Sequence, residues 1–112
     1  MPEALEWDEL DEAAMHMLAL SAAGVPIGCG RLLPAGKIGR MAVLREWRGQ
    51  GVGRTLLQAL LEMACRQGLP AVSLSAQVQA IPFYQRVGFE AYGDSYLDAG
   101  IPHRDMSLQL SV

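Results

Sequence analysis

The clearest pattern of apolar and polar positions lies in the middle of the chain. From Gly51 onward, apolar residues recur at steps of three and four, at Val52, Leu56, Ala59, Leu60, Met63 and Ala64. That spacing gathers them on one face of an α-helix. Gly68 and Pro70 are residues of the kind that end helices. We therefore predict an amphipathic helix that begins near Gly51 and stops at Gly68.

Shorter segments around this helix have the pattern of strands. Residues 37–44 (KIGRMAVL) follow a Pro-Ala-Gly turn, and residues 71–77 (AVSLSAQ) alternate apolar side chains with serines, as strands do. Residues 82–88 begin with proline and end with glycine, which suits a short helix. We expect two more strands at 89–92 and 106–110. This order predicts one domain of the α+β (α/β) class.

The first 20 residues fit two structures. The content of Glu, Ala, Leu and Met, with Pro2 near the start, favours a helix over Glu3–Glu12 by intrinsic propensity. AMHMLAL before SAAG, followed by VPIGCGRLL, also has the pattern of two strands joined by a tight turn. On these residues alone, 13–20 stay open between helix and strand.

Composition excludes several classes of protein. The chain has 112 residues, of which 51% are hydrophobic and 19% charged, so a packed core is expected rather than disorder. No apolar run is long enough for a membrane span, and the acidic start is unlike a secretory signal. We expect a cytoplasmic protein with no metal site, whose two cysteines, Cys29 and Cys65, are reduced core residues.

The net charge of -3 argues against nucleic acid as the main partner. The charges are nevertheless segregated along the chain. Before Arg31 the charged residues are all acidic: Glu3, Glu6, Asp8, Glu9, Asp11 and Glu12. The next stretch is mostly basic: Arg31, Lys37, Arg40, Arg45, Arg48, Arg54 and Arg66. A basic middle can bind a compact polyanion locally.

The most informative segment is the glycine loop from Arg48 to Gly53 (RGQGVG), which lies between a predicted strand and the predicted helix. The first N–H groups of a helix have no partner inside it and attract anions. Glycines let the main chain approach an anion closely, and the flanking arginines add charge. The spacing matches neither a Rossmann fingerprint nor a Walker loop. The alternative is a glycine turn that only allows tight packing of strand on helix.

Two stretches together resemble one family. Residues 37–64 (KIGRMAVLREWRGQGVGRTLLQALLEMA) look like the central strand, pyrophosphate loop and long helix of the GNAT superfamily of N-acetyltransferases. Residues 74–93 (LSAQVQAIPFYQRVGFEAYG) look like its fifth strand and F-Y-x-x-x-G-F segment. A narrower likeness is to the ElaA-type branch. It rests on LSAQ, on G-I-P-H-x-x-M at 100–106, and on Asp11, Ala14, His16, Leu18 and Ala19.

The resemblance implies a fold. The expected sheet is mixed and mostly antiparallel, the long helix follows the central strand, and residues 13–20 form a strand. Family members usually begin with a strand and one or two helices that help to wall the acceptor site. These elements have no match here, so the chain is expected to be shortened at its N-terminus. The cofactor half is expected to be intact.

The resemblance also implies an activity, the transfer of an acetyl group from acetyl-CoA to a primary amine. Main-chain amides of Gln50 to Thr55 would hold the pyrophosphate, with Arg48 and Arg54 assisting, and the pantetheine arm would lie along the strand at 41–43. The implied cofactor-binding residues are Met41, Ala42, Val43, Arg48, Gly49, Gln50, Gly51, Val52, Gly53, Arg54 and Thr55. The acceptor would be a small-molecule or peptidyl amine.

Two side chains are candidates for proton chemistry. Tyr84 would assist the leaving thiolate, although proton transfer from a phenol to a thiolate is uphill by about 2 kcal/mol. A lysine-like amine is neutral in roughly one molecule per few thousand at pH 7, so a base is needed, and His103 is the candidate. Tyr84 could instead only pack the short helix, and His103 could only cap a turn. His16 is a weaker candidate on a buried strand.

Three functions remain open from the sequence. The first is the acetyltransferase. In it, the acidic side chains of Glu6, Asp8 and Asp11 either attract a cationic acceptor or are simply a solvated end of the chain. The second is an acyl-CoA-binding module with little or no catalysis, suggested by the shortened N-terminus. The third is a structural or partner-binding module whose glycine loop is only a turn. In a variant of the first, a second subunit completes the acceptor wall, which predicts a homodimer.

Overall fold

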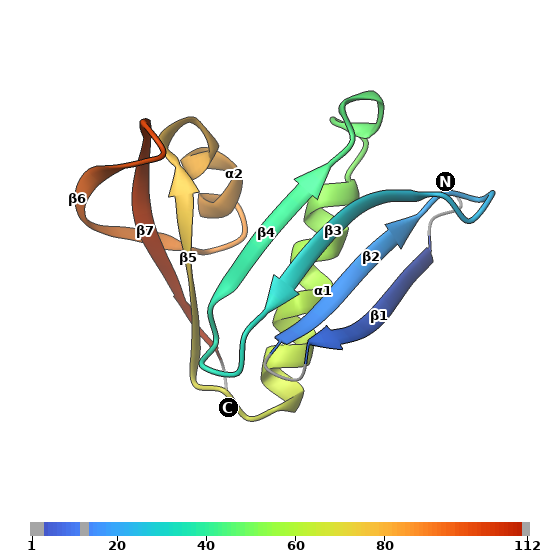
Figure 1. The fold of residues 1–112 in the computed structure, drawn as a ribbon. Coiled ribbons are helices and arrows are strands. Elements are labelled where there is room, and N and C mark those ends of the chain that lie inside the picture. The colour runs from blue at the N-terminus through green and yellow to red at the C-terminus, as the bar shows by residue number, and fades with distance from the viewer. Residues whose placement is uncertain (1–3, 12–13, 111–112) are drawn as a thin grey trace.

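The computed structural model describes residues 4–11 and 14–110. Seven strands, two α-helices and two short 3₁₀ helices follow one another along them (Figure 1). The strands are β1 (Ala4–Asp11), β2 (Ala14–Leu20), β3 (Pro26–Leu32), β4 (Ile38–Val43), β5 (Ala71–Gln77), β6 (Glu90–Asp98) and β7 (Ile101–Gln109). The helices are η1 (Arg45–Trp47), α1 (Val52–Arg66), η2 (Val78–Ala80) and α2 (Ile81–Gln85).

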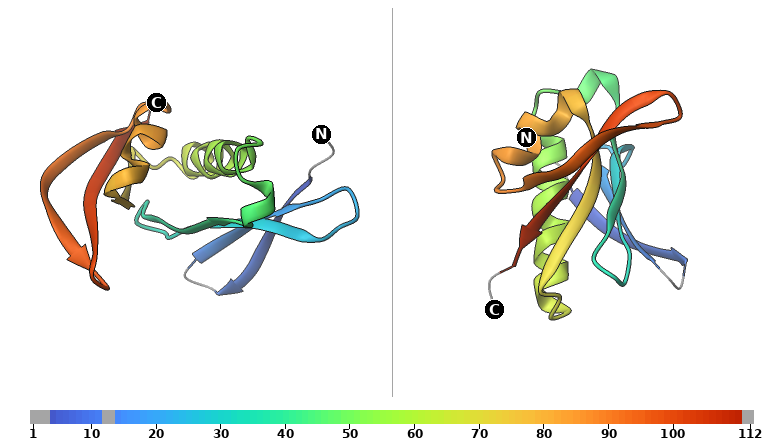
Figure 2. Two further views of the ribbon diagram at one scale, coloured as in Figure 1. Left: turned by 90° about the horizontal axis from the view of Figure 1, so that it is seen from above. Right: turned by 90° about the vertical axis from the view of Figure 1, so that its left-hand side faces the viewer.

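The strands form two antiparallel sheets, and α1 covers one face of the larger one (Figure 2). The larger sheet has the order β1-β2-β3-β4, and the smaller one has the order β5-β7-β6. The buried stripe of α1 confirms the predicted helix, and it consists of Val52, Leu56, Leu57, Leu60 and Ala64. Gly28 and Gly30 let this stripe approach β3, because a Cβ on Gly30 would lie 2.8 Å from Leu60 Cδ1.

The two sheets meet at the start of β4 and β5 and then separate. A parallel bridge joins Lys37 to Ser73, and the main-chain N–H of Ser73 donates to Gly36 O at 3.0 Å. Beyond this point the two strands diverge (Figure 1). Among the strands that the structure describes, none therefore neighbours the edge of β4 over its second half.

The smaller sheet has one apolar and one polar face. Val72, Leu74 and Ala76 of β5 are buried, while the alternating Ser73, Ser75 and Gln77 lie on the opposite side, called here the outer face. On β7, Ser107 is paired with Ser73, Asp105 with Ser75 and His103 with Gln77. The alternation predicted for residues 71–77 is confirmed.

The structure corrects the prediction for the N-terminal segment. The helix predicted over Glu3–Glu12 is wrong, since residues 4–11 form β1. Main-chain pairing with β2 outweighs the helical propensity of this stretch. The strand implied for residues 13–20 is confirmed as β2. A strand does precede β2, contrary to the expectation of a missing first strand, and only residues 12 and 13 separate the two.

Other differences concern extent and burial. The last two strands are longer than predicted, over 90–98 and 101–109 instead of 89–92 and 106–110. The cysteines are not both in the core, because Cys65 is exposed on α1 and Cys29 is only half-buried on β3. Within the described residues, neither helix has the length and apolar character needed to cross a membrane.

Gly36 is the residue on which the junction of the two sheets depends, and Gly36→Ala tests it. Its φ is +92°, and a Cβ would lie 2.7 Å from the carbonyl oxygen of Ala71. We expect a loss of about 3 kcal/mol in the free energy of unfolding, measured by urea denaturation. Gly24→Ala is the control, because its φ is +79° with open space around it, and it should cost only about 1 kcal/mol. Equal losses would contradict the prediction.

Candidate active site

The start of α1 exposes main-chain donors. Gly51 is the N-cap residue, with a φ of +86° and no side-chain cap. Main-chain bonding into the helix begins with Thr55 N–H, which donates to Gly51 O at 3.0 Å. Among the described residues, no main-chain acceptor is found for the N–H groups of Val52, Gly53 and Arg54. These three N–H groups are therefore open to a ligand. The N–H of Thr55 was also predicted to bind the cofactor, but it is taken up by the hydrogen bond to Gly51 O.

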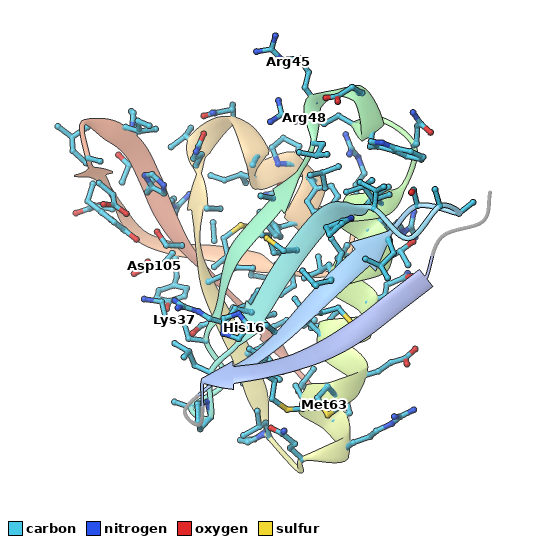
Figure 3. The ribbon with its side chains drawn as sticks, turned by 45° about the vertical axis from the view of Figure 1, so that its right-hand side comes forward. His16, Lys37, Arg45, Arg48, Met63 and Asp105 are labelled. Carbon is cyan, nitrogen blue, oxygen red and sulfur yellow. The ribbon has the colours of Figure 1, made fainter. Side chains whose placement is uncertain are left out.

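The charges around this helix start favour an anion. The first turn contains no acidic residue, although acids stabilise this end of a helix, and it carries Arg54 instead. Arg45 and Arg48 extend from the turn between β4 and α1 (Figure 3). All three arginines are exposed. Positive charge where a helix prefers negative charge is expected at a binding site for an anion.

The free edge of β4 ends beside these arginines. Leu44 N–H donates inward to Ile27 O of β3 at 2.8 Å. Because successive residues of a strand point their main-chain groups to opposite sides, the N–H and C=O of Val43 face the open edge. Arg48 Nε donates to Val43 O at 3.1 Å. The Val43 N–H remains as a donor on the edge.

Two cavities adjoin this edge. The first has a volume of about 520 Å³ and is lined by Met41, Ala42, Val43, Trp47, Arg48, Gly49, Gly51, Val52, Gly53, Arg54, Ala80, Phe83 and Tyr84. The structure thus brings together nine of the eleven predicted cofactor residues. Thr55 follows in the helix, and the side chain of Gln50 donates to Glu46 O at 3.2 Å.

The second cavity lies between the diverging strands. Its volume is about 340 Å³, and its lining consists of Ile38, Gly39, Met41, Leu74, Ser75, Ala76, Gln77, Ala80, Tyr84 and His103. Both predicted catalytic side chains, Tyr84 and His103, line it. Met41, Ala80 and Tyr84 belong to both cavities. A long ligand in the first cavity can therefore end next to a second ligand in the other.

Tyr84 stands at this junction with its ring held by neighbours. Its ring packs edge-on against Phe83 and Phe89, with centroids 5.0 and 5.8 Å away. Burial raises the pKa of the Tyr84 hydroxyl above its ordinary value. The phenol therefore stays protonated and is a poorer acid than free tyrosine. It can donate a hydrogen bond more readily than it can give up its proton.

His103 presents one nitrogen as an acceptor. Its Nδ1 lies 2.7 Å from the carbonyl oxygen of Ile101. Because a carbonyl only accepts hydrogen bonds, Nδ1 carries the proton, and the neutral ring keeps its lone pair on Nε2. The ring also stacks on Tyr96, with centroids 6.3 Å apart.

Comparison with known proteins identifies the family. The model of the acetyltransferase (GNAT) domain matches residues 1–110. The chain belongs to the GNAT acetyltransferase family. Within it, the chain is 36% identical over 110 residues to YjcF of Bacillus subtilis (strain 168), named as an uncharacterized N-acetyltransferase. The match covers 95% of this chain and 78% of that protein.

Solved structures of GNAT proteins have the same fold. An acyl-CoA N-acyltransferase from Pseudomonas aeruginosa is 36% identical with a TM-score of 0.76, over 84% of this chain and 67% of that one. Escherichia coli ElaA is 27% identical with a TM-score of 0.76, over 88% of this chain and 74% of that one. The GNAT fold and the likeness to ElaA expected from the sequence are confirmed.

One residue that the sequence analysis named as a candidate lies away from the two cavities, and one residue that lines a cavity was not predicted. His16, on β2, lines neither cavity. The side chains of Glu6, Asp8 and Asp11 lie outside the described part of the structure. Ser75 lines the second cavity but was not predicted as a site residue. The alternation of serines along β5 put it opposite the core, yet gave no sign that a cavity would lie there.

Two alanine substitutions in the glycine loop of this GNAT domain should act in opposite directions. A Cβ on Gly53 would make only ordinary contacts, the nearest 3.6 Å from Phe83 Cζ, so Gly53→Ala should raise the free energy of unfolding by about 0.5 kcal/mol. Gly51→Ala should lower it by about 1 kcal/mol, because alanine is strained at a φ of +86°. Urea denaturation measures both. Changes of the same sign would contradict the loop geometry.

Proposed function

We propose that residues 1–112 act as one domain that catalyses the transfer of an acetyl group from acetyl-CoA to a primary amine, by direct attack of the amine on the thioester. The observation that carries this proposal is the meeting of the two cavities at Tyr84, with unbonded main-chain N–H groups in one and the His103 acceptor in the other. Membership of the GNAT family supports acyl transfer from CoA.

The first cavity suits acetyl-CoA in both its polar and its apolar parts. The N–H groups of residues 52–54 and the guanidinium groups of Arg48 and Arg54 would hold the pyrophosphate. The open edge of β4 would bind the pantetheine arm as an added strand would be bound. Apolar walls from Met41, Val43 and Phe83 suit the same arm. When bound there, the thioester supplies an acyl carbon that an amine can attack.

Tyr84 would assist the leaving sulfur. Its side chain lines both cavities, and burial, which raises the pKa of the hydroxyl, keeps it protonated. Full transfer of its proton to a thiolate costs about 2 kcal/mol for an unperturbed phenol, and the raised pKa increases this cost. Tyr84 therefore acts as a hydrogen-bond donor that stabilises the developing negative charge on sulfur.

His103 would accept a proton from the attacking nitrogen. A lysine-like amine must first become neutral, at a cost of about 4–5 kcal/mol at pH 7. The nitrogen then loses a further proton as the N–C bond forms. His103 Nε2, with Nδ1–H fixed on Ile101 O, is the acceptor lining the cavity that suits this step.

Binding of CoA tests the first half of the proposal. Gly51→Val should weaken binding of CoA and acetyl-CoA at least tenfold, because a branched side chain would strain the N-cap and cover the N–H groups. Calorimetry measures the affinities. Gly24→Val is the control, since it introduces the same strain in the β2–β3 turn. If the parent chain binds neither ligand at millimolar concentration, the loop is only a turn and the proposal is wrong.

Turnover separates an enzyme from a module that only binds acyl-CoA. Release of CoA is measured over a panel of primary amines: an aliphatic diamine, a peptide with a free α-amino group, and a lysine peptide with its α-amino group blocked. We expect saturable release with at least one. Binding without release would favour the acyl-CoA-binding module. A stable dimer by light scattering would support an acceptor wall completed by a second subunit.

Tyr84→Phe tests the role of the hydroxyl. We expect kcat to fall about 100-fold, with KM for acetyl-CoA nearly unchanged, because the lost hydrogen bond forms only as charge develops on sulfur. The loss should be the same from pH 6 to pH 9, since the raised pKa keeps the phenol protonated over that range. Tyr92→Phe, on the exposed part of β6, is the control. Equal rates for the two variants would mean that Tyr84 only packs α2.

A further inference from the structure

Three polar side chains on the outer face of the smaller sheet form a hydrogen-bonded chain that reaches the second cavity. Tyr96 Oη, on β6, donates to Asp105 Oδ1, on β7, at 2.6 Å. Ser75 Oγ, on β5, makes a short hydrogen bond with the same Tyr96 hydroxyl. Of the three, Ser75 lines the cavity, together with Tyr84 and His103. The chain links all three strands of the sheet to that cavity.

The direction of each hydrogen bond in this chain is fixed by the carboxylate. Ionised Asp105 can only accept, so the single proton of the Tyr96 hydroxyl is committed to it. The Tyr96 oxygen can then only accept from Ser75, which commits the serine proton as well. Ser75 Oγ is left with lone pairs alone to offer to the cavity. It can bind an N–H group but cannot donate to a carbonyl or an anion.

The surroundings of Tyr96 keep its hydroxyl protonated, so that it can donate to Asp105. Hydrogen bonding to Asp105 is the largest cause that raises the pKa of the Tyr96 phenol, while the bond from Ser75 opposes it. The charge of Asp98, on the same strand, also raises this pKa. In register, His103 is opposite Tyr96 and Tyr92 is opposite Asp105. The phenol therefore stays protonated at neutral pH and continues to donate to the carboxylate.

His103 supplies a second acceptor in the same cavity. Its Nε2 keeps a lone pair, because Nδ1–H donates to Ile101 O. Ser75 and His103 are diagonal neighbours on paired strands, since Ser75 is opposite Asp105 and Gln77 is opposite His103. Diagonal neighbours on one face lie about 7 Å apart, which leaves room for one nitrogen between their polar atoms.

We propose that Ser75, polarised by Tyr96 and Asp105, binds one N–H of the acceptor amine while His103 binds the other, so that the site selects primary amines. This inference rests on the proposed function. With both N–H groups engaged, the nitrogen lone pair points to the thioester. As the N–C bond forms and the C–S bond breaks, His103 takes one proton, and the N–H on Ser75 remains in the product amide. Tyr84 donates a hydrogen bond to the departing thiolate until the thiolate takes up a proton from solvent.

The test compares a primary amine with its N-methyl derivative. The probe is the primary amine of the panel above with the highest kcat/KM. A secondary amine has one N–H, which His103 must receive, so it gains nothing from Ser75. We expect the parent chain to prefer the primary amine at least tenfold. Ser75→Ala and Tyr96→Phe should each lower kcat/KM for the primary amine about tenfold and leave the secondary amine nearly unchanged.

Matched variants separate this role from a structural one. Ser73→Ala removes a hydroxyl from the same face of β5, and Tyr92→Phe removes one from β6; neither residue lines the second cavity. Asp98→Asn removes a carboxylate of the same hairpin outside the chain. All three should keep the parent's selectivity, and every variant should bind CoA as the parent does.

Three outcomes would overturn the inference or the proposal beneath it. Equal losses for the primary and secondary amines in Ser75→Ala would show a structural role only. Unchanged selectivity in both Ser75→Ala and Tyr96→Phe would show that the chain takes no part in binding the acceptor. No turnover of any amine by the parent chain would instead contradict the proposed function, and the selectivity of Ser75 with it.

Discussion

The site depends on one constraint: within the described residues, β4 and β5 are joined only at their starts. The bond from Ser73 N–H to Gly36 O fixes the two strands side by side, and beyond it no strand covers the second half of β4. A sheet interior leaves its main-chain groups paired, whereas this edge leaves the Val43 N–H open. Both cavities exist because the sheet is divided here. The left-handed conformation of Gly36 and its contact with Ala71 therefore matter to the site as well as to stability.

The parts of the site that could be predicted from sequence are local ones. The helical period of α1 and the glycines before it are properties of neighbouring residues, and the structure places nine predicted cofactor residues around one cavity. The segment around Tyr84 was found in the same way, as a continuous motif. For the N-terminal segment, the likeness to the family gave the right answer for β2 where helical propensity left it open.

The parts that could not be predicted depend on contacts between distant strands. Residues 4–11 have helical propensity, but pairing with β2 makes them a strand. Ser75, Tyr96 and Asp105 are each unremarkable in sequence and acquire a role only through the register of β5, β6 and β7. Cys65 was placed in the core by its apolar neighbours, although its position on α1 is on the exposed face. Periodicity locates a face, but it does not say what lies opposite that face.

The two cavities differ in the polar groups named for them, and under the proposed function this difference assigns each ligand to one cavity. The first offers donors: main-chain N–H groups of residues 52–54 and the guanidinium groups of Arg48 and Arg54. The second includes two acceptors, Ser75 Oγ and His103 Nε2. Under the proposed function, an anionic cofactor pairs with the donors of the first cavity, and an amine pairs with the acceptors of the second. If either ligand bound in the other cavity, polar groups of that cavity would remain without hydrogen-bond partners. Under the same proposal, Tyr84, a donor at the junction, would stabilise the negative charge that develops on the leaving sulfur.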